Sequence, residues 1–433
     1  MLMAQPSKRC VRFLSSSWTA RCGEIGSMLR LFNSLTRRKE RFVTRANGVV
    51  KLFVCGPTVY DYAHLGHART YIAFDIIARY LRFLGYNVRF LMNITDVAER
   101  IFQRAGELHR DSFQLAREYE SYFLDDMKAL GIGTVDGYFR ASEYIPEMIA
   151  QVTGLINRGV GYETNTGVYF EVRKFPKFGQ LSGQSQQEFG LRRLELCSSK
   201  RNPEDFSLWR KYENEPGWDS PWGHGRPGWH IEDTAISMSN FGETYDVHGG
   251  ASELIFPHHE AEIAQAEALS GKSPFVRFWL HSGLLSVKGR KMSKSLGNVI
   301  RIRDALKKYT AQELRYYFAS FHYRQQIVAF ETAIRRAKFE LNALTRNLES
   351  FLATEVAPSS RSGKRFQATL THAEAVFKRY MDDDFNTPGA LNELAVLSKR
   401  LAAFANKRRK IDEDSKNSGE ATFRRMADVL GIL

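Results

Sequence analysis

The sequence predicts an α/β protein in which a parallel nucleotide-binding sheet carries an insertion and is followed by an α-helical bundle. A strand–loop–helix–strand unit near the start is typical of such a sheet, and its parts are "KLFVCG", "PTVYDYAHLGH", "ARTYIAFDIIARYLRFLG" and "YNVRFLMNITD". From about residue 301 the pattern becomes that of amphipathic helices. The 433 residues provide enough chain for two or three domains with a large core.

Local signals justify each element of the predicted sheet. "KLFVCG" is a short apolar run that predicts a buried strand, and the helix after it has a helical periodicity that stops at Gly85. Helical stretches continue to about residue 160. Residues 161–225 are rich in Gly, Pro and aromatic residues and contain "GVYFEVRKF", which predicts an insertion with its own small sheet. The parallel sheet is expected to resume with "ETYDVHGG" and to add a later strand in "FWLHSGLLSV".

Apolar residues spaced three and four apart predict the C-terminal helices. The first stripe consists of Ile334, Ala337, Leu341, Leu344, Leu348 and Phe351. After a loop in "APSSRSGKR", the stripe continues with Leu370, Ala373, Phe377 and Met381. Thr387 and Pro388 predict a helix start, and the stripe that follows is Leu394, Leu397, Leu401 and Phe404. "NKRRKIDEDSKNSGE" is expected to form a charged, solvated connection before a last short helix.

The composition, with 43% hydrophobic and 25% charged residues, is ordinary for a globular protein. No run of about 18 apolar residues occurs, so the sequence predicts no membrane span. Lys and Arg exceed Asp and Glu by 14 (62 against 48), which slightly favours a polyanionic partner such as nucleic acid over an ordinary basic surface. The cysteines at 10, 22, 55 and 197 form no CxxC pair, which fits a reducing compartment.

The first 27 residues allow two interpretations. They are rich in Arg, Lys and Ser and contain no acidic residue before Glu24, which is compatible with an organelle-targeting segment. We favour the alternative that Met28 is the real start, because "MLRLFNSLTRRKERF" has the pattern of the opening of a folded domain.

The tetrapeptide "HLGH" lies where the loop after the first strand enters a helix. Helix N-termini attract anions through their free N–H groups and the helix dipole. His64 and His67 can hydrogen-bond a phosphate there, and Gly66 lets a ligand approach the backbone. Two histidines near a helix start are nevertheless more often ordinary surface residues, so this motif alone is weak evidence.

A second cationic motif, "KMSKS", lies some 220 residues later. Lys291 and Lys294 are three apart and flanked by hydroxyl groups and glycines, which suits a phosphate-binding loop as well as a solvated basic turn. Together, "HLGH" and "KMSKS" resemble the motif pair of class I aminoacyl-tRNA synthetases. That resemblance implies that both motifs bind ATP and stabilise the pentacoordinate phosphorus during formation of an aminoacyl-adenylate.

The segments between the two motifs narrow the resemblance to the cysteinyl-tRNA synthetases. It rests on "FVCGPTVYDYAHLGHARTYIAFDIIARYLRFLGY", "NITD", "KRNPEDFSLW", "SPWGHGRPGWHIE", "DVHGGASELIFPHHEAEIAQAEA", "KMSKSLGN", "FHYR" and "MDDDFNTPGAL". These segments occur in one order from roughly residue 28 to the C-terminus, so the resemblance is specific. It implies a Rossmann-type catalytic domain at 28–300 with an insertion at about 136–225, a stem-contact-like segment at 301–330, and a tRNA-binding bundle at 331–433. The anticodon-reading module of the family is expected to be short or missing.

The resemblance also implies a zinc site that selects cysteine through its thiolate. The family's ligands are two cysteines, a histidine and a glutamate, and the matching positions here are Cys55, Asp233, His258 and Glu262. Asp233, in "HIEDTAI", is a departure that is similar to the archaeal branch of the family. A carboxylate is an acceptable zinc ligand, so we expect zinc to be retained; the alternative is a metal-free pocket in which Asp233 hydrogen-bonds a neighbour. His259 is expected to point elsewhere.

The resemblance assigns the remaining site residues. The cysteine pocket is expected to contain Cys55, Gly56, Thr95, Trp229 and His248. The ATP site is expected to contain His64, Gly66, His67, Gly249, Gly250, Glu253, Lys291, Ser293 and Lys294. Glu253 stands where the family commonly has aspartate for the ribose hydroxyls, which is a departure from the family's pattern.

The implied reaction is ligation of cysteine to tRNA(Cys) with ATP and Mg²⁺, through cysteinyl-adenylate, by a monomeric cytoplasmic enzyme. It is mitochondrial instead if residues 1–27 are a transit peptide. One alternative is a relative that joins cysteine to a small amine, as the mycothiol-pathway ligases do. Another is a non-catalytic tRNA-binding paralogue, against which the intact "HLGH" and "KMSKS" motifs argue.

Overall fold

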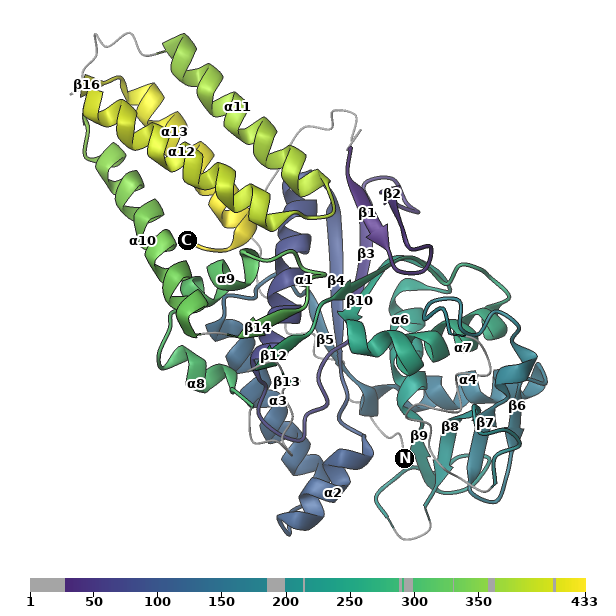
Figure 1. The fold of residues 1–433 in the computed structure, drawn as a ribbon. Coiled ribbons are helices and arrows are strands. Elements are labelled where there is room, and N and C mark those ends of the chain that lie inside the picture. The colour runs from purple at the N-terminus through teal and green to yellow at the C-terminus, as the bar shows by residue number, and fades with distance from the viewer. Residues whose placement is uncertain are drawn as a thin grey trace, which may run out of the picture.

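The computed structural model shows an α/β body with a helical bundle at one end and a small antiparallel sheet at the other (Figure 1). The residues that the structure describes are 28–184, 199–212, 215–287, 290–291, 299–329, 331–356, 363–407 and 410–433. Two strands form a hairpin at the start of this part, β1 (Arg30–Asn33) and β2 (Arg38–Arg41). They belong to the segment that was expected to open the folded domain.

The centre of the molecule is a five-stranded parallel sheet, as the sequence predicts. In spatial order its strands are β11 (Val276–Ser282), β10 (Tyr245–Ala251), β3 (Val49–Val54), β4 (Asn87–Ile94) and β5 (Gly137–Arg140). Strands β3 and β4 are joined by α1 (Leu65–Phe83), the crossover helix that a parallel pair requires. The sheet domain boundary needs one correction, because β5 pairs with β4 although the insertion was expected to begin at about residue 136.

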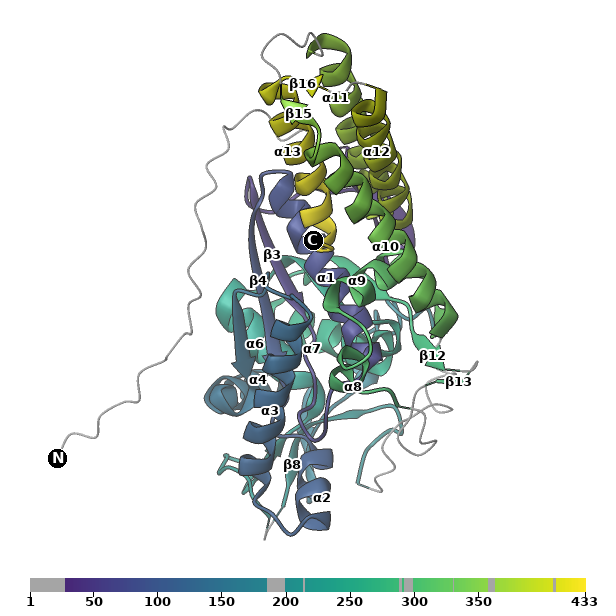
Figure 2. The same ribbon diagram turned by 90° about the vertical axis from the view of Figure 1, so that its left-hand side faces the viewer.

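Helices cover both faces of the central sheet (Figures 1 and 2). Alternate residues of a strand point to opposite faces, so Leu52 and Val54 contribute to one core and Phe53 to the other. The first face carries α1, α2 (Glu99–Glu107) and α3 (Ser112–Ala129). The second face carries α4 (Ile145–Asn157), α6 (Trp229–Phe241) and α7 (Glu260–Ser270). Short helical turns are η1 (Ala141–Tyr144), η2 (Val172–Lys174), η3 (Ser252–Leu254) and η4 (Ile255–His259).

The insertion forms its own antiparallel sheet, as predicted. Its strands in spatial order are β6 (Gly161–Glu163), β7 (Gly167–Phe170), β8 (Phe206–Lys211) and β9 (Gly225–Pro227). Strand β9 leads directly through Gly228 into α6. The insertion therefore delivers the chain to the start of the helix that carries Asp233.

The strand predicted in "FWLHSGLLSV" is two strands that belong to different sheets. Strand β11 ends at Ser282, and β12 (Leu285–Val287) pairs with β13 (Arg290–Lys291) and with β14 (Ile327–Ala329). The break lies at Gly283, where a Cβ atom would stand 2.2 Å from the backbone oxygen of Gln325. Strand β14 was not predicted in this otherwise helical region, which also contains α8 (Ile302–Leu306) and α9 (Ala311–Ala319).

The C-terminal region is a bundle of long helices. They are α10 (Glu331–Leu352), α11 (Gly363–Asp382), α12 (Thr387–Lys407) and α13 (Glu413–Leu430), with short strands β15 (Glu355–Val356) and β16 (Lys410–Ile411). The predicted stripes of α10 and α11 are buried throughout, and in α12 Leu394, Leu397 and Leu401 are buried. Residues 357–362, in the loop predicted from "APSSRSGKR", lie outside the described residues.

The last helix is longer than the sequence predicts. Asp412 accepts a hydrogen bond from the backbone N–H of Ser415 at 2.8 Å and starts α13 inside the segment expected to be a solvated connection. Gly419, within that segment, packs against the rings of Phe351 and Phe366. Burial of one face thus overrides the polar composition. Among the described residues, none of the helices combines the length and apolar character that a membrane crossing requires.

Candidate active site

A buried polar cluster lies where several elements end at the central sheet. Cys55 follows strand β3 directly, and His248 lies in the adjacent strand β10. Asp233 comes from the first turns of α6, and His258 and Glu262 come from η4 and α7. The carboxyl end of a parallel strand beside helix starts is the usual place for a ligand site in an open α/β sheet.

The distances within the cluster are those of direct contact. The Cys55 thiol lies 2.7 Å from Oδ2 of Asp233, and that oxygen lies 3.2 Å from Nε2 of His258. The same His258 nitrogen is 3.2 Å from Oε1 of Glu262. The four positions expected from the sequence to bind metal are therefore brought together. Each of these side chains is at least 95% buried.

The local sequence explains how His258 and Glu262 reach one site. Phe256 has an extended backbone that interrupts the helical turn of η4, and the chain then continues into α7. Residues four apart on a helix share a face, so the two side chains meet. Both carboxylate oxygens of Glu262 are buried and accept no hydrogen bond from a described group, which is costly unless a cation or an unseen donor satisfies them.

His259 also belongs to the cluster, which corrects the expectation that it points elsewhere. Its Nε2 lies 3.1 Å from the Cys55 sulfur and 3.9 Å from Glu262. Ligand atoms of Cys55, His258, His259 and Glu262 lie within 4.8 Å of one another, and so do those of Cys55, Asp233, His248 and Glu262. The adjacent histidines of "PHHEAE" thus both face the site.

Burial sets the protonation of these groups. Burial, reinforced by the negative charges of Asp233 and Glu262, raises the pKa of the Cys55 thiol well above its usual value. Burial and Asp233 likewise raise the pKa of Glu262. Burial lowers the pKa values of His248 and His259, so both imidazoles are neutral and able to donate a lone pair. A divalent cation would compensate the crowded anionic groups, and a thiolate, carboxylates and imidazoles are zinc-type ligands.

A second layer of side chains orients the cluster. Asn93 donates to Oδ1 of Asp233 at 2.6 Å, and the Tyr245 hydroxyl lies 2.6 Å from Nδ1 of His248. His230 contacts His258 at 2.9 Å through their Nδ1 atoms, and His281 lies 2.8 Å from Nδ1 of His259. Such partners fix the tautomer and direction of metal-binding imidazoles. Sequence reasoning missed all four, although Asn93 lies in the "NITD" segment that it quoted.

The residues expected to form the amino-acid pocket surround this cluster. Trp229 stacks on His258 with ring centroids 4.1 Å apart, and it remains 43% exposed, so it forms the outer wall. Thr95 is buried, and its hydroxyl accepts a hydrogen bond from Asn93 at 3.2 Å. At Gly56 a Cβ atom would lie 1.7 Å from the backbone oxygen of Asn93, so no other residue fits there.

The "HLGH" motif forms the start of α1. His64 is the N-cap; its Nδ1 accepts from the Gly66 N–H at 3.1 Å, and Nδ1 of His67 accepts from the His64 N–H at 3.2 Å. The two imidazoles stack with centroids 4.0 Å apart. The rings thus lie side by side at the positive end of a 19-residue helix.

The segment after "KMSKS" is paired directly with "HLGH". The Leu65 N–H donates to Ile300 at 2.9 Å, and the Ile302 N–H donates to Ala63 at 3.0 Å. The backbone of Lys291 lies in β13. Ser293 and Lys294 lie outside the described residues. Ile300 and Ile302, which follow "KMSKS" in the sequence, are therefore joined to the chain at "HLGH" by backbone hydrogen bonds.

The remaining predicted ATP-site residues lie in and just after strand β10, which contacts both the "HLGH" helix α1 and the buried cluster. Gly249 and Gly250 are in β10, where Cβ atoms would stand 2.2 Å from the ring of Phe74 and 2.9 Å from that of His259. Glu253 is in the turn η3 that follows. The glycines allow the strand to pass close to α1 and to the cluster, which the sequence alone did not reveal.

Comparisons with known proteins agree with this geometry. Residues 41–339 match the family described as "tRNA synthetases class I (C) catalytic domain", and residues 376–433 match the "DALR domain". The chain is 46% identical to "Cysteine--tRNA ligase" of Thermococcus onnurineus over 93% of this chain and 86% of that protein. It is 50% identical to "Cysteine--tRNA ligase" of Thermoplasma volcanium over 69% of this chain and 66% of that protein.

A solved structure supports the fold. Methionyl-tRNA synthetase of Mycobacterium tuberculosis, solved with methionyl-adenylate, superimposes with a TM-score of 0.64 at 18% identity. The match covers 89% of this chain and 90% of that one. At this identity the likeness concerns the arrangement of helices and strands only.

Proposed function

The chain belongs to the class I tRNA synthetases of the cysteine family, and on that premise we propose how its residues activate cysteine and transfer it to tRNA. The membership confirms the resemblance found in the sequence, the α/β fold with a helical C-terminal region, and the ligase activity. The name "Cysteine--tRNA ligase" of the similar proteins favours tRNA over a small amine as the acceptor.

The first step is attack of the cysteine carboxylate on the α-phosphorus of ATP, which forms the mixed anhydride and releases pyrophosphate. We assign stabilisation of the developing phosphate charge to His64 and His67 at the start of α1 and to Lys291 and Lys294 of "KMSKS". The pairing of Leu65 with Ile300 supports this assignment, because it fixes where the chain leaves "KMSKS" relative to "HLGH". Gly66, Gly249, Gly250, Glu253 and Ser293 complete the proposed ATP site.

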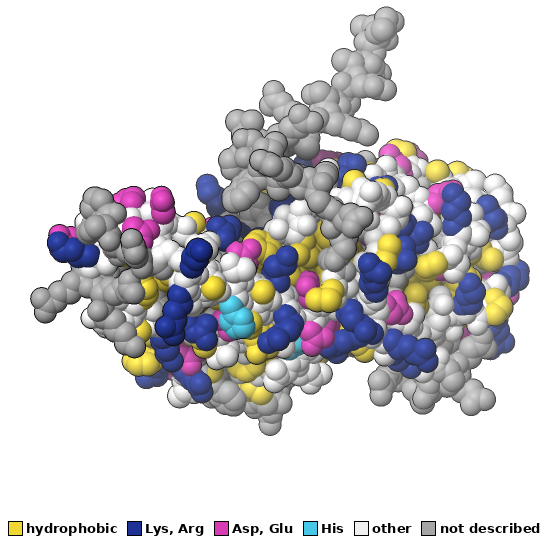
Figure 3. All heavy atoms as spheres, turned by 90° about the horizontal axis from the view of Figure 1, so that it is seen from above, with side chains coloured by type: hydrophobic (Ala, Val, Ile, Leu, Met, Phe, Trp, Pro, Cys, Tyr) yellow, Lys and Arg dark blue, Asp and Glu magenta, His cyan; other side chains and the backbone are white. Residues whose placement is uncertain are grey.

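The second step is attack of a hydroxyl of the terminal ribose of tRNA on the activated carbonyl, which releases AMP. We propose that the bundle 331–433 and the stem-contact-like segment 301–330 hold the rest of the RNA, while 28–300 carries the catalysis. Lys and Arg side chains are spread across the face of the molecule seen in Figure 3, and the net charge of +14 is complementary to a polyanion.

We further propose that the buried cluster holds one zinc ion through Cys55, Asp233, His258 and Glu262. The unsatisfied carboxylate of Glu262 supports this fit, as does the grouping of thiol, carboxylate and imidazole donor atoms within reach of one another. Bound zinc would supply affinity for the substrate thiolate, which a serine hydroxyl cannot match because it barely ionises. The chain's own contribution is to exclude water and to orient the donors, with Trp229 stacked on His258 at the outer side of the cluster.

The single observation that carries this proposal is a buried thiol–carboxylate–imidazole cluster at Cys55, which follows strand β3 and precedes the "HLGH" loop, where Leu65 pairs with Ile300 after "KMSKS". Its test is amino-acid-dependent exchange of labelled pyrophosphate into ATP. We expect exchange with cysteine and at least about 100-fold less with serine, because binding differences of a few kcal/mol give such ratios. Equal exchange with both amino acids would refute the assignment of the cluster to side-chain selection.

A further inference from the structure

The loop 321–325, which joins α9 to β14, is a meeting point for three parts of the molecule. Its backbone oxygens face the "HLGH" helix, its side chains face the connection between α11 and α12, and its tight packing against Gly283 reaches the strand that leads to "KMSKS". None of the proposed catalytic residues lies in this loop.

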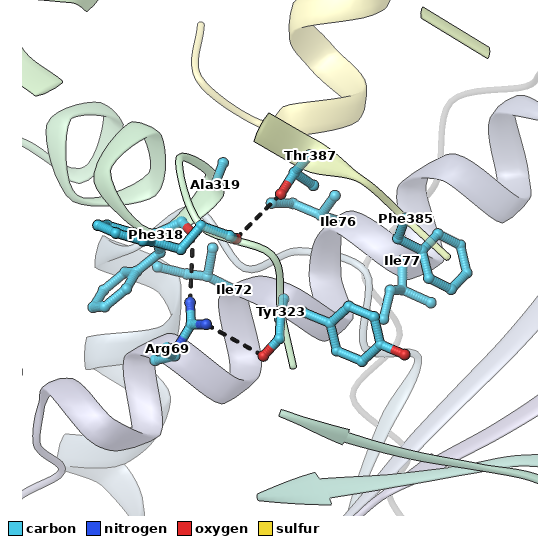
Figure 4. A pocket seen from close by; sticks show the side chains of 11 residues that line it. Arg69, Ile72, Ile76, Ile77, Phe318, Ala319, Tyr323, Phe385 and Thr387 are labelled. Carbon is cyan, nitrogen blue, oxygen red and sulfur yellow. Dashed lines mark hydrogen bonds between the residues drawn. The ribbon is translucent and has the colours of Figure 1, made fainter. Parts of the chain in front are cut away.

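Arg69 ties the loop to the "HLGH" helix (Figure 4). It lies in the second turn of α1 and is only 1% exposed. One terminal nitrogen donates to the backbone oxygens of His322 at 2.9 Å, Tyr323 at 3.2 Å and Gln325 at 2.9 Å, and the other donates to Phe318 at 3.4 Å. A buried cation with several carbonyl partners holds the helix and the loop at one fixed separation.

The same loop fixes the chain that leads to "KMSKS". The Gly283 N–H donates to the Tyr323 oxygen at 2.8 Å, and Gly283 leaves no room for a Cβ atom against Gln325. Gly283 lies between β11 and β12, and β12 pairs with β13, which contains the backbone of Lys291. Loop 321–325 therefore contacts both the "HLGH" helix and the chain that leads to "KMSKS".

Asp384 ties the loop to the bundle. It lies between α11 and α12, and its carboxylate is fully buried. One oxygen accepts from the Phe32 N–H at 2.8 Å and the Tyr323 hydroxyl at 3.0 Å, and the other accepts from Nε of Arg324 at 2.7 Å. The Asp384 N–H donates to the Arg30 oxygen at 2.9 Å. Asp384 thereby ties the bundle to β1 and to the loop, and Thr387 adds a hydrogen bond from its hydroxyl to the Phe321 oxygen at 3.4 Å.

The backbone at this point is held in an unusual conformation. Asp384 and Phe385 have φ angles of 60° and 52°, in the left-handed region that a bulky residue such as Phe385 rarely adopts. Phe385 is 1% exposed, and its ring contacts those of Tyr80 on α1 and Tyr323 in the loop. Burial of Phe385 and the hydrogen bonds of Asp384 hold a turn that would otherwise relax.

We propose that Asp384 is a positioning residue for the transfer step, because it sets the place of the helical bundle relative to the "HLGH" helix through loop 321–325. Activation of cysteine needs only groups that are already held together by Arg69 and by the pairing of Leu65 with Ile300. Transfer also needs the 3′ end of an RNA whose body rests on the bundle. A misplacement of about 1 Å is enough to lower the rate of such a step strongly. The inference rests on the proposed function.

The test compares Asp384→Asn with Asp383→Asn in the full-length, metal-loaded protein. Asparagine has the shape of aspartate and tolerates a positive φ, so the backbone is preserved while one acceptor oxygen and the charge are lost. Asp383 is the matched control, because its carboxylate is 57% exposed and pairs only with Lys39 among the described residues. Pyrophosphate exchange, charging of tRNA and binding of tRNA are measured for each variant.

For Asp384→Asn we expect exchange within about twofold of wild type, tRNA affinity within about threefold, and a charging kcat at least about tenfold lower. Asp383→Asn is expected to match wild type in all three. Tyr323→Phe removes one donor to Asp384 and is expected to lower the charging kcat less, again with exchange unchanged. This variant replaces Asp384→Asn in the test if Asp384→Asn fails to fold.

Two results would overturn the inference: charging by Asp384→Asn at the wild-type rate, or an equal loss of exchange and charging in a folded variant. Failure of the wild-type protein to charge tRNA in the same assay would count against the proposed function instead. The two failures are therefore distinguishable.

Discussion

Asp233→Asn should weaken zinc binding strongly, because Asp233 is the proposed zinc ligand that contacts two of the other three proposed ligands. Its Oδ2 contacts both the Cys55 thiol and His258, and the residue is 1% exposed. Asparagine keeps the shape and an oxygen for the Asn93 hydrogen bond, but it removes one negative charge from the cluster.

The expected loss in zinc affinity can be derived from the charge that Asp233 contributes and from its role as a direct ligand. A unit charge pair about 4 Å apart is worth about 4 kcal/mol at an effective dielectric constant of 20, part of which desolvation cancels. Loss of residues that only support a ligand already costs about 10–100-fold in metal affinity. Loss of a direct ligand should therefore lower zinc affinity by about 100–1,000-fold, or about 2.7–4.1 kcal/mol.

The assay is competition for zinc between the protein and a chromogenic chelator at pH 7.5, followed by measurement of the cysteine KM in pyrophosphate exchange. Asp233→Cys, which restores the family's thiolate, should retain zinc. Glu232→Gln is the matched control, because it removes a buried carboxylate one position away and should change the affinity by less than about tenfold. Equal zinc affinities for Asp233→Asn and wild type would refute the assignment of Asp233 as a ligand.

Three further predictions concern the rest of the site and the core. His64→Ala should lower the rate of pyrophosphate exchange by about 100–1,000-fold, and His64→Asn should restore helix capping without restoring that rate, which thermal unfolding and exchange measure separately. Arg315→Met leaves the buried Asp75 carboxylate without its 2.6 Å partner and should cost about 3–5 kcal/mol in urea unfolding, whereas Arg79→Met, which removes a partly exposed partner, should cost about 1 kcal/mol. Burial lowers the pKa of His281 to about 3, so in the metal-free protein the unfolded chain binds a proton that the folded chain does not between about pH 3 and 6.5. Stability should therefore fall as the pH drops through that window, and His281→Gln should reduce the slope by about 1.4 kcal/mol per pH unit; an unchanged slope would contradict the buried, neutral state of His281.

The sequence alone was sufficient to predict an element where one physical pattern determines that element. The stripe from Ile334 to Phe351 was fully predictable, because a helix that packs on one side must repeat its apolar residues at that spacing. The parallel strands were equally clear, since apolar runs separated by helical segments leave few alternatives. The spacing of His258 and Glu262 placed both on one helical face before the fold was known.

The features that the sequence did not predict depend on contacts between segments that are distant in the sequence. Strand β14 is three residues long and exists because β12 lies beside it, and α13 begins inside a polar segment because Gly419 packs on Phe351. His259 was expected to face away, but the cluster is wide enough that His258 and the adjacent His259 both reach it. No local signal encodes these arrangements.

The most direct test of the function is transfer of labelled cysteine to total tRNA with ATP and Mg²⁺, with the label recovered in acid-precipitable RNA. The structure predicts that the wild-type chain charges RNA with cysteine and that the label is released by mild base, as expected for an ester. Cysteine-dependent pyrophosphate exchange without any charging of RNA would contradict the assignment of tRNA as the acceptor.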